Sequence, residues 1–115
     1  MLGVDIEENK RFNKDRISDS KFLERIFTKL ELDYCYSKSN PAPHLCARFC
    51  AKEAVMKVCT YKGISILKYN DIEIYNGSKG EPYVRILDNN HKDIKIDISI
   101  SHNKTNSIAV AMIKE

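Results

Sequence analysis

Two apolar stripes run along the segment from Leu45 to Val58 when it is placed on a helix of about 3.6 residues per turn. One stripe consists of Ala47, Ala51, Ala54, Val55 and Val58, and the second of Leu45, Phe49 and Met56. Asn40 is a favourable N-cap and Pro41 suits the first helical position, so the sequence predicts a helix that ends near Cys59. A helix that is apolar on two sides needs packing partners on both, and this requirement constrains the rest of the fold.

Glu53 and Lys57 lie between the two stripes, one helical turn apart. Charge is unfavourable there, because an ion that leaves water must be neutralised or paired. The pair therefore either neutralises itself or has a third partner, such as a metal or a phosphate. An ordinary ion pair on the rim of a core helix also explains the spacing, and the segment alone favours that explanation.

Alternating patterns predict strands near both ends of the chain. Aliphatic residues alternate with others in the first positions, namely Leu2, Val4 and Ile6. A strand there places Asp5 on the face opposite these side chains. Another strand is predicted from Ile94 to Ser101, with His102 where it ends, and a last one from Ser107 to Ile113. Polar side chains at the ends of such elements can converge on one cleft.

The middle of the chain divides into short helices and a hairpin. Asp19 or Ser20 can cap one helix, and the sequence from Thr28 to Glu31 is typical of a capping box at the start of another. From Gly63 the apolar period changes to two, which predicts strands over 64–66, 72–74 and 82–86. The turn-forming run 76–80 makes the last two a hairpin. We therefore predict an α+β fold with a mainly antiparallel sheet packed against a long helix plus shorter helices.

Length and composition limit the classes of protein that fit. The 115 residues form a single domain, 1–115, near the size at which oligomerisation adds useful burial. No apolar run approaches the roughly 20 residues of a membrane helix. The N-terminus enters a strand pattern without the features of a secretory signal, so we expect a cytoplasmic protein.

Basic residues crowd the segment after the first strand, although the net charge is only +3. They are Lys10, Arg11, Lys14, Arg16, Lys21, Arg25 and Lys29. Such a segment predicts an acidic partner, either nucleic acid or an acidic protein. A solvated helix face is the commoner explanation of a charge run.

The four cysteines are expected to be small buried side chains without disulfides. Cys46 and Cys50 share a helix face near His44, so a zinc site is an alternative. A closed zinc site needs about four ligands, and no second paired motif provides the rest.

Asp5, Glu53, Lys57 and His102 together suit phosphoryl transfer. Two carboxylates fit a magnesium ion, which completes its shell with water and phosphate oxygens. Lys57, one turn from Glu53, would meet the same phosphate. Phosphoryl transfer depends mainly on positioning and charge neutralisation, so these groups form a sufficient minimal set.

Four motifs occur in the order and at roughly the spacing of one enzyme family. They are Gly3-Val4-Asp5-Ile6 followed by Lys10-Arg11, Arg48-Phe49-Cys50-Ala51-Lys52-Glu53-Ala54 with Lys57, Gly80-Glu81-Pro82-Tyr83, and Ser99-Ile100-Ser101-His102. With them the chain resembles holo-acyl-carrier-protein synthase, the small trimeric type of 4'-phosphopantetheinyl transferase, over nearly its whole length.

The resemblance implies a role for each matching residue. Asp5 and Glu53 would hold magnesium against the pyrophosphate of coenzyme A, and Lys57 would balance the phosphate charge. Glu53 would accept the proton of the attacking serine, directly or through a metal-bound water. The nucleotide end would be bound by Arg48 at the 3'-phosphate, Gly80 and Pro82 on the adenine side, and Ser101 and His102.

The same resemblance implies partners and an assembly. The phosphopantetheine arm would pass to a serine of an apo acyl carrier protein in fatty acid biosynthesis, and adenosine 3',5'-bisphosphate would leave. Arg11, Lys21 and Arg25 would receive the acidic carrier protein. The pocket would lie between adjacent subunits of a homotrimer.

Two alternative functions, neither of them enzymatic, would use parts of the same sequence. A basic module that binds nucleic acid or an acidic protein without catalysis would use the segment 10–29, but it leaves Glu53 and the Ser101-His102 end without a role. A zinc-stabilised interaction domain would use Cys46, Cys50 and His44. Salt-dependent binding to nucleic acid would support the first reading, and stoichiometric zinc would support the second.

Overall fold

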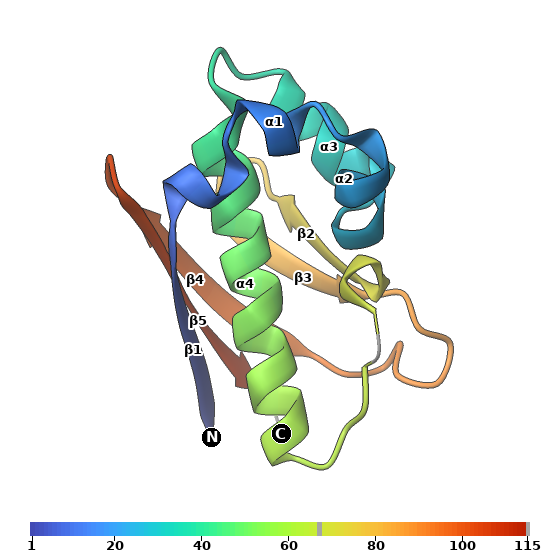
Figure 1. Ribbon diagram of the computed structural model, residues 1–115. Helices are drawn as coiled ribbons and strands as arrows, with labels where there is room; N and C mark the ends of the chain where they lie inside the picture. Colours follow the sequence, from blue (N-terminus) through green and yellow to red (C-terminus); the bar gives the residue numbers. More distant parts are fainter. Residues whose placement is uncertain (67, 115) are drawn as a thin grey trace.

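The computed structural model describes residues 1–66 and 68–114, and one long helix lies at its centre. This helix, α4 (Pro41–Tyr61), lies across one face of a three-stranded antiparallel sheet (Figure 1). In spatial order the strands are β1 (Leu2–Glu8), β5 (Asn106–Ile113) and β4 (Ile96–His102). A hairpin of β2 (Ile72–Asn76) and β3 (Pro82–Ile86) lies beside β4. Three short helices cover the first half of α4: α1 (Lys14–Ile17), α2 (Ser20–Ile26) and α3 (Lys29–Tyr36). The predicted α+β fold is confirmed.

The two sides of α4 pack into two separate clusters of buried side chains, which confirms the two apolar stripes except at Met56, because this residue of the second stripe packs against the cluster on the sheet side. Ala51, Ala54, Val55 and Val58 pack against the sheet and the β2–β3 hairpin. Leu45, Cys46 and Phe49 pack against α2, α3 and the 3₁₀ helix η1 (Asn9–Phe12). None of the helices in the described part of the chain is long and apolar enough to cross a lipid bilayer.

Strand β1 approaches α4 so closely that only glycine fits at one position. A Cβ atom on Gly3 would lie 2.2 Å from the carbonyl oxygen of Ala54. The alternation of the strand then turns Asp5 toward α4 and leaves Val4 and Ile6 exposed on the outer face of the sheet. The prediction that Asp5 lies opposite the aliphatic side chains is confirmed.

A buried ion pair fixes the loop after α4 to the helices. The Nζ of Lys52 lies 2.6 Å from Glu31 Oε1 and also donates to the carbonyls of Ile26, at 2.6 Å, and Tyr69, at 3.1 Å. Glu31 accepts further hydrogen bonds from the backbone of Thr28 and of β2. Both charged side chains are fully buried, so their mutual pairing and these backbone bonds are what make the burial tolerable.

Local signals in the sequence predicted several boundaries correctly. The Asp19 side chain caps α2, and Thr28 and Glu31 form the capping box of α3. The strand predicted at 64–66 is wrong. Ile64 and Ile66 pack singly against the core from a segment without strand pairing, so their alternation reflects a loop that crosses the end of the helix.

Candidate active site

Asp5 and Lys57 join β1 to the C-terminal half of α4. Their Oδ1 and Nζ atoms are 3.2 Å apart, and Lys57 Nζ also donates to the carbonyl of Val4 at 2.9 Å. About two turns before Lys57 on the same side of α4, the Cys50 thiol donates to the carbonyl of Asp5 at 3.1 Å. The hydrogen bond from Lys57 to Asp5 raises the pKa of this lysine, so the ammonium form is favoured.

Glu53 lies on the side of α4 that carries Cys50 and Lys57, one turn from each. Its Oε1 accepts a 2.6 Å hydrogen bond from the hydroxyl of Tyr69, in the 3₁₀ helix η2 (Tyr69–Asp71). Lys57 bonds to Asp5 and not to Glu53. The ordinary ion pair within the helix is thus replaced by contacts that reach from α4 to β1 and to η2.

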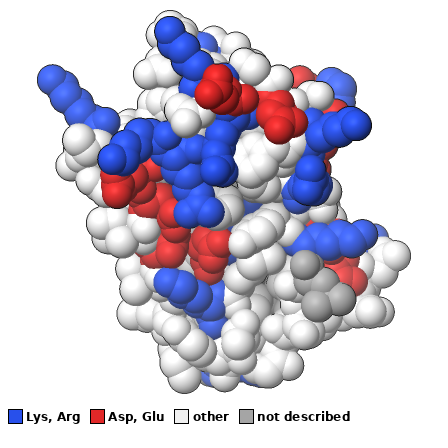
Figure 2. Space-filling model, in the orientation of Figure 1, with Lys and Arg blue, Asp and Glu red and all other residues white. Residues whose placement is uncertain are grey.

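Glu7 is a third acid in this region, and it is not among the predicted site residues. Its Oε1 lies 2.9 Å from Arg11 Nη1. Burial and the neighbouring carboxylate of Asp5 raise the pKa of Glu7 to about 7, against the opposing effect of Arg11. The sequence contains a signal for Glu7, because side chains two positions apart on a strand share a face, and Glu7 therefore points toward α4 as Asp5 does. Figure 2 shows acidic side chains gathered over β1 and α4, with basic side chains above and below them.

The site offers carboxylate oxygens as ligands for a magnesium ion, but only a few of them. Asp5 Oδ2 is buried and has no hydrogen-bond partner among the described residues, so one carboxylate oxygen lacks compensation. Across residues 1–66 and 68–114, no group of three or more His, Cys, Asp or Glu side chains is arranged to hold a metal ion. A cation that keeps several waters needs only one or two carboxylates, so the donor chemistry of Asp5 and Glu53 suits magnesium.

Arg48 belongs to a second group of side chains, beside the β2–β3 hairpin. It is only 5% exposed, its guanidinium lies 4.0 Å from the centre of the Tyr34 ring, and it donates to Asn76 Oδ1. Arg48 Nε has no hydrogen-bond partner in the described structure. Asn76 donates in turn to the carbonyl of Gly80 at 3.0 Å and pairs with Pro82 across the hairpin. Three of the predicted nucleotide-binding residues are therefore connected.

His102 extends this second group from the end of β4. Its ring centre is 6.2 Å from that of His44, and His44 lies 6.2 Å from Tyr34, the ring that stacks on Arg48. Burial and the nearby cationic groups lower the pKa of His44, so its imidazole favours the neutral form. Ser101 precedes His102 on β4 and is exposed.

The α4 residues of the two groups, Glu53 and Lys57 in one and Arg48 in the other, project from opposite sides of the helix. Lys57 follows Arg48 by nine positions, which at about 100° per residue turns the side chain by roughly half a turn. Glu53 is likewise turned well away from Arg48. One chain therefore pairs Asp5 with Lys57, with Glu53 on the same side of α4 as Lys57, and separately groups Arg48, Gly80, Pro82 and His102. It does not bring the two groups to one side of the helix.

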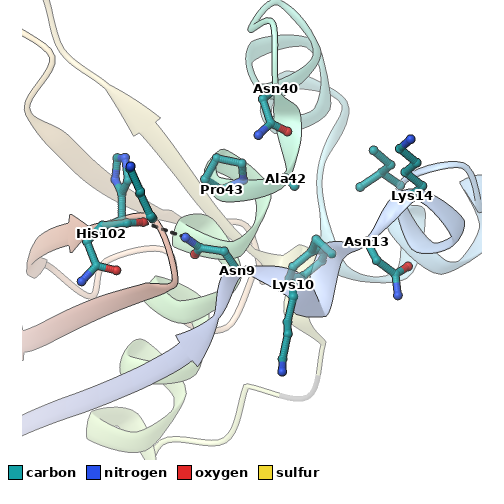
Figure 3. A pocket seen from close by; sticks show the side chains of 12 residues that line it. Asn9, Lys10, Asn13, Lys14, Asn40, Ala42, Pro43 and His102 are labelled. Atoms are coloured by element: carbon teal, nitrogen blue, oxygen red, sulfur yellow. Dashed lines mark hydrogen bonds between the residues drawn. The ribbon is translucent and has the colours of Figure 1, made fainter.

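A cavity of about 820 Å³ lies beside His102 (Figure 3). His102 stands at one edge and Lys14 at the other, with Ala42 and Pro43 of α4 between them. Hydrogen bonds fix the loop at this edge, because Asn9 donates to the carbonyl of Asn103 at 2.8 Å. Lysines and asparagines predominate among the polar lining residues, so the cavity suits an anionic group with an apolar part.

Arg11 and Arg25 meet at a smaller hollow of about 330 Å³ between η1, α2 and α4, which we call the docking hollow. It is lined by Arg11, Phe22, Arg25, Ile26, Phe49 and Tyr69. Lys21 lies one turn before Arg25 on α2, and its carbonyl accepts a hydrogen bond from Arg25 Nε. Of the three predicted partner-binding residues, Arg11 and Arg25 therefore line one hollow, and Lys21 belongs to the same helix as Arg25.

The thiols proposed as zinc ligands in the alternative reading donate to backbone carbonyls instead. Cys46 donates to Glu8 at 3.5 Å, and Cys50 donates to Asp5. Burial raises the pKa of both thiols, that of Cys46 to about 11. These neutral thiols attach α4 to β1.

Sequence comparison relates the chain to one enzyme family. The model of the 4'-phosphopantetheinyl transferase superfamily matches residues 1–113. A holo-[acyl-carrier-protein] synthase from Aquifex aeolicus is 38% identical over 122 residues, which cover 100% of this chain and 98% of the relative. One from Thermodesulfovibrio yellowstonii is 42% identical over 115 residues, covering 97% and 96%.

Solved structures of the same class share the fold. The Helicobacter pylori holo-[acyl-carrier-protein] synthase in complex with coenzyme A superimposes with a TM-score of 0.79 at 27% identity, covering 99% of this chain and 100% of the other. A synthase from Bacillus anthracis, in complex with CoA (3',5'-ADP), gives 0.80 at 29% identity, covering 97% and 93%.

Proposed function

The chain belongs to the 4'-phosphopantetheinyl transferase superfamily, and from this membership we propose that it transfers the 4'-phosphopantetheine group of coenzyme A to a serine of an apo acyl carrier protein. The observation that carries the proposal is the match over the full chain to holo-acyl-carrier-protein synthases, two of which are solved with coenzyme A or its nucleotide part. The placement of the four motifs agrees with it, since their polar side chains form two compact groups.

In the proposed reaction the serine oxygen bonds to the β-phosphorus of coenzyme A. The bond from that phosphorus to the oxygen of the nucleotide half breaks, and adenosine 3',5'-bisphosphate leaves. Glu53 accepts the serine proton, which is a suitable task for a carboxylate held by a single side-chain donor. Lys57 stands one turn away, where its ammonium balances charge on the diphosphate.

Asp5 and Glu53 are the residues that would hold magnesium. When bound, the ion would neutralise charge on the diphosphate as the bond breaks. The unpaired buried oxygen of Asp5 supports this assignment, because a carboxylate in that position needs a cationic partner. In the structure Lys57 supplies part of that compensation.

The site would be completed by a second subunit of a homotrimer. The outer face of the sheet supports this, because it exposes a continuous aliphatic patch in which residues of β1 stand opposite residues of β5. The patch consists of the exposed side chains of Leu2, Val4, Ile6, Ile108 and Met112, with the half-buried Val110 among them. Packing it against a neighbouring copy would bury this surface. It would also allow the Asp5 group of one chain to face the His102 group of another, which one chain does not achieve.

The carrier protein would bind at the docking hollow. Arg11 and Arg25 line it together with apolar rings, and Lys21 extends the basic surface along α2. Basic side chains around an apolar hollow complement an acidic helix that carries a few apolar residues. A nucleic-acid partner has less support, because it would give no role to Glu53 or to the group formed by Arg48, Gly80, Pro82 and His102.

Intact-mass spectrometry of an apo acyl carrier protein, incubated with coenzyme A, magnesium and the protein, tests the proposal. The expected result is a mass gain of one phosphopantetheine group. Glu53→Gln should slow the gain by at least about a hundredfold, whereas the matched control Glu8→Gln, an exposed acid on β1, should not. No gain with several carrier proteins would refute the proposed function.

A further inference from the structure

The hydroxyl of Tyr69 makes a hydrogen bond that the proposed reaction does not yet use. It donates to Glu53 Oε1 at 2.6 Å. Within the described structure, Glu53 has no second hydrogen-bond donor on its carboxylate. A phenolic hydroxyl keeps its proton across the neutral range, so it remains a donor to this carboxylate.

Tyr69 is held on α4 at two further points. Its carbonyl accepts a hydrogen bond from Lys52 Nζ, the buried ammonium that neighbours Glu53 in sequence. Its ring centre is 5.4 Å from that of Phe49, one turn before Glu53. Backbone and ring are therefore fixed relative to the helix that carries Glu53, and the hydroxyl has little freedom to turn away.

The same ring lines the docking hollow together with Arg11 and Arg25. Tyr69 is thus the residue that touches both the surface where the carrier would bind and the carboxylate that would accept the serine proton. A side chain that bound in this hollow would rest on the tyrosine ring, with the Glu53 carboxylate beyond its hydroxyl.

We propose that Tyr69 is a positioning residue for Glu53. Its hydrogen bond fixes Oε1 and so leaves Oε2 available to the cation or to the serine proton. The inference rests on the proposed function and deepens it, since it connects carrier docking to the reacting carboxylate. An unfixed Glu53 would sample other rotamers, and a carboxylate that is only part of the time in position lowers the rate of the chemical step.

Tyr69→Phe tests this role because it removes only the hydroxyl. The ring on Phe49 and the carbonyl that binds Lys52 remain, so the fold should persist, as a thermal unfolding curve will show. The matched control is Tyr36→Phe, which removes a tyrosine hydroxyl bonded to the carbonyl of Ile17, away from Glu53. Transfer to an apo carrier is followed for all three proteins, with kcat and the two KM values determined separately.

We expect Tyr69→Phe to lower kcat by about five- to tenfold, the loss typical of one hydrogen bond to a charged group that water partly replaces. The KM for coenzyme A should change less than about twofold, and Tyr36→Phe should match the wild type. An unchanged kcat for Tyr69→Phe in an active preparation would overturn the inference and leave the proposed function intact. A parallel fall in Tm with an unchanged kcat would assign Tyr69 a structural role only, and a wild type without transfer would refute the proposed function itself.

Discussion

Asp5 and Lys57, 52 residues apart in the sequence, form an ion pair with 3.2 Å between Oδ1 and Nζ. The pair places a cation beside the acid before any metal or substrate is bound. It also leaves 44% of the Lys57 side chain exposed, where a diphosphate would arrive. The contact thus relates the β1 motif to the α4 motif within a single chain.

Lys57→Met should therefore weaken coenzyme use without unfolding the protein. The substituted side chain keeps the length of the lysine stem but cannot balance phosphate charge, so we expect kcat/KM for coenzyme A to fall by at least about tenfold. Steady-state kinetics with a saturating carrier measures the effect. A variant that retains the wild-type kcat/KM would show that Lys57 does not contact the diphosphate.

Gly3→Ala should destabilise the fold strongly. The added Cβ would lie 2.2 Å from the Ala54 carbonyl, so β1 must move away from α4 at an expected cost of at least about 3 kcal/mol. Gly63→Ala is the control. Gly63 has φ of 74° but open space around it, so the strain there should cost only about 1 kcal/mol. Urea denaturation compares the two, and equal losses would contradict the close packing of β1 on α4.

Alkaline pH should destabilise the protein through its buried thiols. Burial raises the pKa of Cys35 from 9.0 to about 12 and that of Cys46 to about 11. A raised folded-state pKa contributes stability that is present below pH 9 and is lost as the pH rises toward 11 to 12, because the unfolded thiols ionise first. Each thiol should contribute up to about 1.4 kcal/mol per pH unit in this window.

Denaturation of wild type and Cys35→Ala at pH 8, 10 and 11 checks this expectation. The variant will be less stable at pH 8, because it loses a buried side chain, but its stability should fall less steeply with pH. The same slope for both proteins would show that Cys35 ionises as readily in the folded chain as in the unfolded one.

Val4→Glu should dissociate the proposed trimer. Val4 stands opposite Val110 in the exposed aliphatic patch, so a charge there would be buried at the subunit contact. We expect a trimer mass for the wild type in light scattering, a monomer for the variant, and loss of transfer activity. Leu87→Glu, at an exposed leucine outside the sheet, should leave the trimer mass and the transfer activity unchanged. A fully active monomer would contradict a site shared between subunits.

Local sequence signals predicted the elements but not what the charged residues of α4 contact. The capping box of α3, the hairpin turn and the orientation of Asp5 follow from neighbouring residues and from a period of two. The burial of Lys52 and Arg48 does not follow from neighbouring residues or from the period of the sequence. Their partners, Glu31 and Asn76, lie at least 21 residues away, so no spacing in the sequence connects them.

The candidate site was predicted in part for the same reason. Asp5, Glu53 and Lys57 were selected by position in their elements and by the family motifs, and the structure pairs Asp5 with Lys57 and turns Glu53 to the same side of α4 as Lys57. Tyr69 was missed because its hydroxyl reaches Glu53 only through the path of the loop after α4, which the incorrect strand at 64–66 misrepresented.

The central claim is that Asp5 and Glu53 hold one divalent cation against coenzyme A. Manganese binding in the presence of coenzyme A, followed by electron paramagnetic resonance, tests it most directly, because Mn²⁺ accepts the oxygen ligands that suit magnesium. We predict that Asp5→Asn and Glu53→Gln each weaken binding by at least about tenfold, whereas Glu8→Gln binds as the wild type does. Wild-type affinity in either Asp5→Asn or Glu53→Gln would contradict the claim.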